Sequence, residues 1–151
     1  NKSGIFINIS SIGGRITFPL MPLYHSTKWA VEGFSESLRW ELAQIGVKVK
    51  LVEPGGVATD FGGRSLDMQH DESLTEYNAF VGNFMQSMQA SMDPSNMSKP
   101  ELIAEVIYEA ATDGKDTLRY RAGADAEQLL AARDSMNDEE FTGMMKAQFN
   151  L

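Results

Sequence analysis

Hydrophobic positions follow first a strand period and then a helix period along the start of the chain. Residues 5–9 form a short β-rich run that is apolar on both faces, which predicts a buried central strand. Over residues 23–46 apolar side chains recur at steps of three and four, which predicts a long amphipathic helix that ends at Gly46. Residues 47–52 alternate apolar side chains with lysines and predict a second strand that stops at the Pro54 turn. Together these elements predict a right-handed βαβ unit with parallel strands.

The second half of the chain continues this alternation. The spacing of Ser98 and Glu101 is that of a capping box and predicts the start of another helix. Residues 117–121 have the pattern of a third strand, and weaker helical patterns follow over 124–133 and 138–148. The order of elements therefore predicts an α/β fold.

An insertion separates the second strand from the helix that follows it. A βαβ unit does not require residues 61–98, because ordinary connections are only a few residues long. A helical stripe of apolar side chains runs through the insertion, with Phe61 and Phe80 nearby, and its members are Leu74, Tyr77, Val81, Phe84, Met85, Met88 and Met92. The stripe indicates either a helix packed on the domain or a flexible lid over an apolar ligand.

Composition narrows the class of protein and its partners. The 151 residues, 42% hydrophobic and 23% charged, are typical of one globular domain, and a net charge of −8 argues against binding to nucleic acid. Cysteine is absent, so we expect no disulfide and a cytoplasmic location. No apolar run approaches the roughly 20 residues of a membrane span. His25 and His70 lack metal-site spacing, so no metal is predicted, and His70 is expected to be solvated.

Three polar groups can meet at one edge of the predicted sheet. Tyr24 and Lys28 are four residues apart on one face of the long helix, a pair that on its own also fits a lysine reaching for water. Ser11 ends the first strand, and the carboxyl ends of parallel strands lie at the same edge. A hydroxyl donor, a phenol that delivers a proton and an ammonium that favours its release suit reduction of a carbonyl by hydride.

At these positions the sequence resembles the short-chain dehydrogenase/reductase family. The resemblance rests on Asn8-Ile9-Ser10-Ser11, Tyr24-His25-Ser26-Thr27-Lys28 and Pro54-Gly55-Gly56-Val57-Ala58-Thr59, with Thr27 in place of the usual serine. It implies an oxidoreductase that transfers a hydride between NAD or NADP and an alcohol or carbonyl. It also implies that Ser11, Tyr24 and Lys28 are catalytic. The implied cofactor-binding residues are Tyr24, Lys28, Pro54, Gly55, Val57 and Thr59.

The resemblance also implies an organisation of the chain. The expected fold is the C-terminal portion of a doubly wound, Rossmann-like parallel sheet, with three strands and flanking helices. Its segments are a catalytic segment over 1–60, a substrate-binding insertion over 61–98, the last helix and strand over 99–123, and a C-terminal helical extension over 124–151.

Parts of the expected enzyme are not in the sequence. A glycine-rich turn for the pyrophosphate is absent, so we expect the catalytic half of a longer protein, inactive by itself. The resemblance implies a homo-oligomer that packs through the long helix. The apolar stripe of the insertion suggests a bulky, apolar carbonyl substrate.

Other functions remain to be weighed. Ser11 with His25 could indicate a hydrolase, but the nucleophile-elbow motif is absent and His25 should point away from the face of Tyr24. Glu53 could act as a general base, although an acid before a Pro-Gly turn is more often hydrogen-bonded to loop amides. A non-catalytic remnant that binds a partner through its sheet edge is an alternative of another class. The presence of Ser11, Tyr24 and Lys28 together favours the enzyme.

Overall fold

The fold was obtained as a computed structural model, which describes residues 2–63, 65–69, 71, 73–91, 93 and 96–151. The predicted solvation of His70 and the stripe position of Met92 lie outside these residues.

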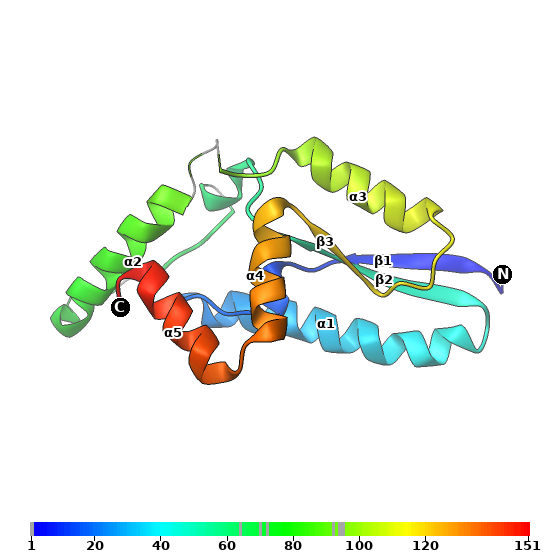
Figure 1. The fold of residues 1–151 in the computed structure, drawn as a ribbon, viewed down its shortest axis with the longest axis horizontal. Coiled ribbons are helices and arrows are strands. Elements are labelled where there is room, and N and C mark those ends of the chain that lie inside the picture. The colour runs from blue at the N-terminus through cyan, green and yellow to red at the C-terminus, as the bar shows by residue number, and fades with distance from the viewer. Residues whose placement is uncertain (1, 64, 70, 72, 92, 94–95) are drawn as a thin grey trace.

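Within the described part of the chain, three parallel strands form one sheet (Figure 1). They are β1 (Gly4–Ile9), β2 (Val47–Pro54) and β3 (Arg119–Ala122), in the order β1-β2-β3. β1 pairs with β2 from Gly4 opposite Val47 onward, and β2 pairs with β3 from Leu51 opposite Arg119. This arrangement confirms the predicted α/β fold with a Rossmann-like parallel sheet.

The first strand is an edge strand and not the buried central strand that its apolar run predicts. Ile5, Phe6 and Ile9 are 39%, 55% and 44% exposed, because β1 has a neighbour on only one side. β2, between two strands and two helices, is buried along nearly its whole length. The β-rich pattern of 5–9 therefore identifies the strand correctly but not its surroundings.

Two long helices, α1 (Pro22–Ala43) and α3 (Pro100–Thr112), cover opposite faces of the sheet (Figure 1). Along α1 the apolar residue Phe34 is 61% exposed, whereas Val31 and Leu38 are half-buried. The fully buried positions are polar. Ser35 accepts a hydrogen bond of 2.9 Å from Asn8, and Glu32 lies on the same side of the helix.

α3 begins differently from the prediction. Lys99 occupies the N-cap position of α3, and no side chain forms a capping hydrogen bond there. The predicted capping box of Ser98 and Glu101 is therefore wrong. Ser98 instead forms a backbone bridge with Val57, which fixes its position before the helix. Pro100 in the first turn starts the helix without a capping side chain.

The remaining helices gather beyond the carboxyl ends of the strands (Figure 1). The α-helices are α2 (Asn78–Ser91), α4 (Ala124–Ser135) and α5 (Asp138–Phe149), and the short 3-10 turns are η1 (Ile12–Gly14), η2 (Asp60–Gly62) and η3 (Thr75–Tyr77). α5 begins with a complete capping box between Asn137 and Glu140. No described helix is both long and apolar enough to cross a lipid bilayer.

Two groups of packed hydrophobic side chains lie within the part of the chain that the structure describes. One, between β2, β3 and α3, consists of Val52, Ile103, Ala110, Tyr120 and Ala122. The other joins η1, α2, α4 and α5 and consists of Ile12, Ile16, Phe84, Ala126, Leu130, Phe141, Met145 and Phe149. The insertion and the C-terminal helices thus share a core with the loop that follows β1. The burial of Phe84 supports the prediction that the apolar stripe belongs to a helix packed on the domain, whereas Met85 of the same stripe is exposed.

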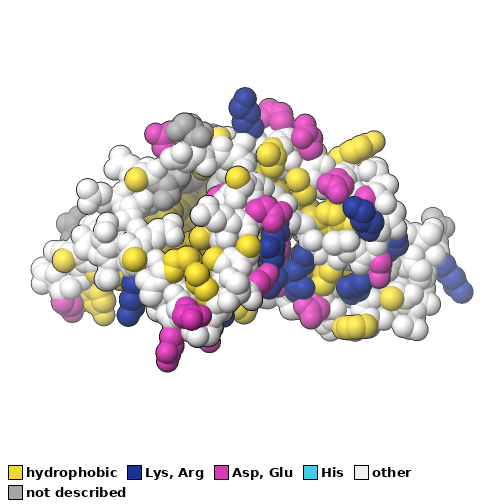
Figure 2. Space-filling view, in the orientation of Figure 1, with side chains coloured by type: hydrophobic (Ala, Val, Ile, Leu, Met, Phe, Trp, Pro, Cys, Tyr) yellow, Lys and Arg dark blue, Asp and Glu magenta, His cyan; other side chains and the backbone are white. Residues whose placement is uncertain are grey.

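Ion pairs hold α4 against β3. Figure 2 shows basic and acidic side chains interleaved beside α4. Arg121 of β3 pairs with Asp134 and, at 3.8 Å, with Glu127, and Arg15 approaches Asp134 at 3.2 Å. These partly exposed pairs contribute little stability individually, but they orient α4 relative to the carboxyl ends of the strands.

Candidate active site

Ser11 lies where β1 ends and η1 begins. Its backbone is extended, and its hydroxyl oxygen accepts a hydrogen bond of 3.0 Å from the Gly13 amide, which caps η1. The hydroxyl hydrogen remains available, because this bond uses only an acceptor site. Local chain geometry therefore leaves Ser11 able to donate to another group.

Tyr24 projects from the first turn of α1 over η1. A Cβ atom added to Gly13 would lie only 2.9 Å from Cε1 of Tyr24, so the phenol ring needs a glycine at that position. The ring also stacks near Phe61 of η2, with 5.8 Å between the two ring centroids. Tyr24 is thus placed between the segments that follow β1 and β2.

Lys28 lies one turn further along the same helix. Its Nζ is 5.9 Å from the centroid of the Tyr24 ring and donates a hydrogen bond of 3.2 Å to the carbonyl of Ile9. The side chain is half-buried, and this burial lowers the pKa of Lys28. An ammonium group has three donors, so two remain for another acceptor.

Ser11, Tyr24 and Lys28 are therefore brought together at the carboxyl end of β1. Ser11 and Tyr24 both contact Gly13, and Lys28 contacts both the Tyr24 ring and Ile9. The cluster combines the Ser11 hydroxyl, from the segment after β1, with a phenol and a cation that lie one turn apart on α1. Such a set can stabilise a developing oxyanion and exchange a proton with it.

The turn after β2 lies at the same edge of the sheet. The Gly55 amide donates to the carbonyl of Ala122 at 3.1 Å, and the Gly56 amide donates to the Asp125 carboxylate at 2.6 Å. Asp125 was not among the predicted site residues. The one sequence signal that could have indicated it is an acid two positions after Gly123, at the start of a helix.

Val57 and Thr59 continue this turn. The carbonyl of Val57 accepts from the Thr59 amide at 2.7 Å, and Thr59 caps η2 by accepting a hydrogen bond from Phe61. Among the described residues, no partner accepts a hydrogen bond from the Val57 amide. The sequence-predicted residues Pro54, Gly55, Val57 and Thr59 thus form one continuous turn, which lies next to Tyr24 through Phe61.

The donors of this edge fit the nicotinamide end of a dinucleotide. A free Val57 amide can donate to a carboxamide oxygen, and the half-buried Lys28 ammonium can donate to sugar hydroxyls. The chain offers no glycine-rich turn of G-x-G-x-x-G spacing for the pyrophosphate. The residues present therefore fit one half of such a cofactor.

His25 has a structural role. Its Nε2 accepts a hydrogen bond of 2.8 Å from the Phe18 amide, so its Nδ1 carries the hydrogen and donates at 2.8 Å to the Gly13 carbonyl. The buried ring touches Tyr24 only edge-on, with centroids 5.6 Å apart. Neither ring nitrogen is available to Ser11, which contradicts the hydrolase alternative.

Glu53 is fully buried directly before the Pro54 turn. Its carboxylate has no hydrogen bond in the described structure, contrary to the expectation that loop amides would bind it. Arg15 and Arg119 each lie 3.5 Å from Oε1, and Glu32 pairs with the same arginine, Arg119, at 3.0 Å. Burial, assisted by the charge of Glu32, raises the pKa of Glu53 to about 7. The group lies behind the site and not in it.

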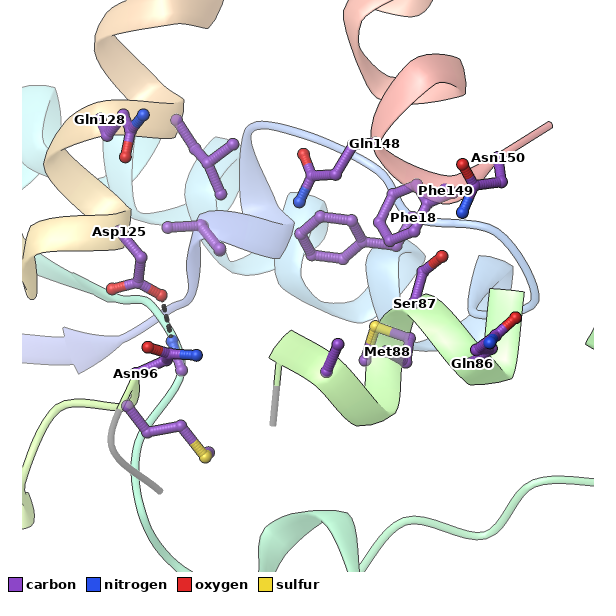
Figure 3. Close-up of a pocket in the computed structure, with 15 residues that line it drawn as sticks. Phe18, Gln86, Ser87, Met88, Asn96, Asp125, Gln128, Gln148, Phe149 and Asn150 are labelled. Carbon is purple, nitrogen blue, oxygen red and sulfur yellow. Dashed lines mark hydrogen bonds between the residues drawn. The ribbon is translucent and has the colours of Figure 1, made fainter. Parts of the chain in front are cut away.

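A cavity of about 810 Å³ opens between α2, α4 and α5 (Figure 3), and Ser11, Tyr24 and Lys28 are not among the residues that line it. Ile12, which follows Ser11, and Gly56, in the Pro54 turn, both line it. Its apolar wall includes Phe18, Met88, Met97, Leu129 and Phe149, and its polar groups include Gln86, Ser87, Asn96, Asp125, Gln128, Gln148 and Asn150. The cavity therefore has a mixed apolar and polar lining, and it approaches the segments after β1 and β2 through Ile12 and Gly56.

Known proteins resemble this chain in sequence and in fold. A family profile described as short chain dehydrogenase matches residues 1–70. An uncharacterized oxidoreductase of Schizosaccharomyces pombe is 41% identical over 151 residues, covering 99% of this chain and 61% of that protein. This chain therefore spans less than two thirds of that relative.

Two solved structures agree with the sequence matches. A short-chain dehydrogenase from Streptomyces avermitilis superposes with a TM-score of 0.69 at 29% identity, covering 97% of this chain and 51% of the other. ElxO with NADP bound gives a TM-score of 0.57 at 27% identity, covering 84% of this chain and 48% of the other. In sequence, fold and the order of its motifs, this chain is similar to members of the short-chain dehydrogenase/reductase family.

Proposed function

We propose that this chain carries the catalytic segment of an NAD- or NADP-dependent oxidoreductase that acts on an alcohol or carbonyl. The observation that carries the proposal is the meeting of Ser11, Tyr24 and Lys28 at the carboxyl end of β1. In this assignment residues 1–60 supply the chemistry and residues 61–98 supply the substrate-binding insertion.

Each residue of the cluster has a separate role in carbonyl reduction. A bound nicotinamide cofactor would supply the hydride for the carbonyl carbon. Ser11 donates a hydrogen bond to the carbonyl oxygen, and Tyr24 transfers its phenolic proton to that oxygen. The positive charge of Lys28, 5.9 Å from the ring, favours the phenolate that remains, and its free donors hold sugar hydroxyls.

The pyrophosphate end of the cofactor requires residues outside this chain. The exposed apolar edge of β1 supports this proposal, because an unpaired apolar strand edge is a surface that proteins normally cover. Further strands against β1 would extend the sheet on the side where a dinucleotide-binding half belongs. The chain on its own is then inactive.

The substrate that suits the cavity is bulky and apolar. The cavity has the volume of a drug-sized ligand site, and aromatic and thioether side chains, including Phe18 and Met88, form part of its wall.

We propose that the protein is located in the cytoplasm, because a chain without cysteine is compatible with a reducing compartment.

The exposed surface of α1 supports a homo-oligomer. Trp29, Phe34 and Trp40 are exposed along this helix, and large apolar side chains exposed on one helix favour burial against a second copy. The same surface and the β1 edge are the features that favour the alternative function, a non-catalytic module that binds a partner.

A substrate panel tests the proposed function and separates it from the alternative. The full-length protein is assayed with NADH and with NADPH against long-chain ketones, cyclic ketones and small polar sugars. We expect reduction of the apolar ketones with one of the two cofactors. Turnover of sugars alone would contradict the apolar substrate, and no turnover together with no cofactor binding would favour the partner-binding module.

A further inference from the structure

Asp125 joins the C-terminal helices to the turn that follows β2. It lies in the first turn of α4, two residues after Gly123, whose φ of 114° few other residues adopt. Its carboxylate accepts the 2.6 Å hydrogen bond from the Gly56 amide, drawn as a dashed line in Figure 3. The contact joins positions 69 residues apart in sequence.

The carboxylate fits closely against the turn. A Cβ atom added to Gly55 would lie 2.2 Å from both Asp125 oxygens, and one added to Gly123 would lie 2.8 Å from Oδ1. The close approach of this carboxylate therefore leaves no room for a side chain at Gly55, and at Gly123 it restricts the space together with Ser98, whose hydroxyl oxygen would lie 2.6 Å from an added Cβ atom. Movement of the turn away from α4 would break the hydrogen bond between Gly56 and Asp125.

The two peptide units around Gly56 are fixed from opposite sides. Asp125 holds the Gly56 amide, and the Ser98 amide donates to the Gly56 carbonyl at 2.9 Å. Because a peptide unit is planar and trans, fixing that carbonyl fixes the opposite direction of the Val57 amide. That amide is the donor left without a partner in the described structure.

We propose that Asp125 is a positioning residue that orients the turn over residues 54–57 to receive the nicotinamide end of the cofactor. The inference rests on the proposed function. It assigns to the C-terminal helical segment a part in cofactor binding, although Asp125 itself need not touch the cofactor.

If Asp125 had only a structural role, it would act by stabilising helix α4. An acid in the first turn stabilises a helix by interacting with its dipole, and Glu127 occupies the same turn of α4. Glu127 is 64% exposed and makes only a 3.8 Å ion pair with Arg121. Glu127→Ala therefore removes a first-turn charge without touching the turn after β2, and it is the matched control.

The test measures cofactor affinity directly. The full-length protein and the variants Asp125→Ala, Asp125→Asn and Glu127→Ala are titrated calorimetrically with the reduced cofactor that the wild type binds, and their apo unfolding temperatures are recorded. We expect Asp125→Ala to weaken binding about tenfold or more, the scale of a lost hydrogen bond to a charged group. Asp125→Asn keeps an acceptor oxygen and should recover part of the affinity, whereas Glu127→Ala should bind as the wild type does.

The outcomes separate this inference from the proposed function. If the wild type binds neither NADH nor NADPH, the proposed function fails. If the wild type binds and Asp125→Ala binds as tightly as Glu127→Ala, the positioning role is overturned while the proposed function stands. If Asp125→Ala does not fold, Asp125→Asn decides: weaker binding at an unchanged unfolding temperature supports the role, and wild-type affinity contradicts it.

Discussion

At the scale of single residues, Glu53 is an acid that the fold buries beside the site without a hydrogen bond. The native protein holds its proton up to about pH 7, whereas an unfolded chain releases it near the ordinary glutamate value. Between these two values the native state binds more protons than the unfolded state. The free energy of unfolding therefore falls as the pH rises between these two pKa values, and above about pH 7 the loss is complete.

Replacing Glu53 by glutamine should remove this pH dependence. Relative to the wild type, Glu53→Gln should gain about 3 kcal/mol of unfolding free energy between pH 4.5 and pH 8. Denaturant unfolding at several pH values measures the difference. Glu105→Gln, on the exposed surface of α3, serves as control and should follow the wild type. A constant difference between Glu53→Gln and wild type across the window would contradict the raised pKa.

The sequence identifies single residues well only where a motif is local. Tyr24 and Lys28 are one helical turn apart, so their meeting follows from the spacing alone. The contact of Asp125 with Gly56 joins distant segments, and neither segment shows it by itself. Glu53 illustrates the same limit, because its arginine neighbours come from η1 and from β3.

At the scale of elements, a buried polar group ties β2 and β3 to the end of α3. Lys50, in the middle of β2, is only 1% exposed. Its Nζ donates to Asp113 at 2.6 Å and to the Tyr120 hydroxyl at 2.8 Å, and that hydroxyl donates to Asp113 at 2.7 Å. These bonds, all to or from charged groups, compensate the burial of the Lys50 charge.

Tyr120→Phe should loosen this junction. The change removes both hydrogen bonds of the phenol and leaves the buried Lys50 ammonium with one partner fewer. We expect a loss of about 1–3 kcal/mol in unfolding free energy, measured by denaturant titration. Tyr108→Phe on α3, where the tyrosine is 71% exposed, should change it by less than about 0.5 kcal/mol. Equal stability of the two variants would show that the Tyr120 hydroxyl contributes nothing to stability.

The order of strands and helices is predictable because each type of element has its own spacing of hydrophobic residues. Gly46, with φ of 73°, ends the connection between α1 and β2 as expected. Which face of an element is buried is less predictable. Apolar side chains of α1 such as Phe34 are exposed to solvent in this chain, while the helix contacts the sheet through the buried side chains of Glu32 and Ser35. The capping box at Ser98 failed because a backbone bridge to Val57 holds that residue instead.

At the scale of the whole molecule, the exposed surface of α1 predicts self-association. A charge placed in that surface by Phe34→Glu should convert a dimer or tetramer into smaller species, because the charge would have to be desolvated in the interface. Sedimentation of the full-length protein measures this. Thr142→Glu, at an exposed position of α5, adds the same charge elsewhere and should leave the assembly intact. A monomeric wild type would contradict the proposed homo-oligomer.

The central claim is that Tyr24 gives the proton to the reduced carbonyl, and Tyr24→Phe tests it most directly. Measured on the full-length protein with its preferred ketone, the variant should lose about 10²–10⁴-fold in kcat. Tyr108→Phe, far out on α3, should retain the wild-type kcat. A Tyr24→Phe variant that turns over ketone at the wild-type rate would contradict the account.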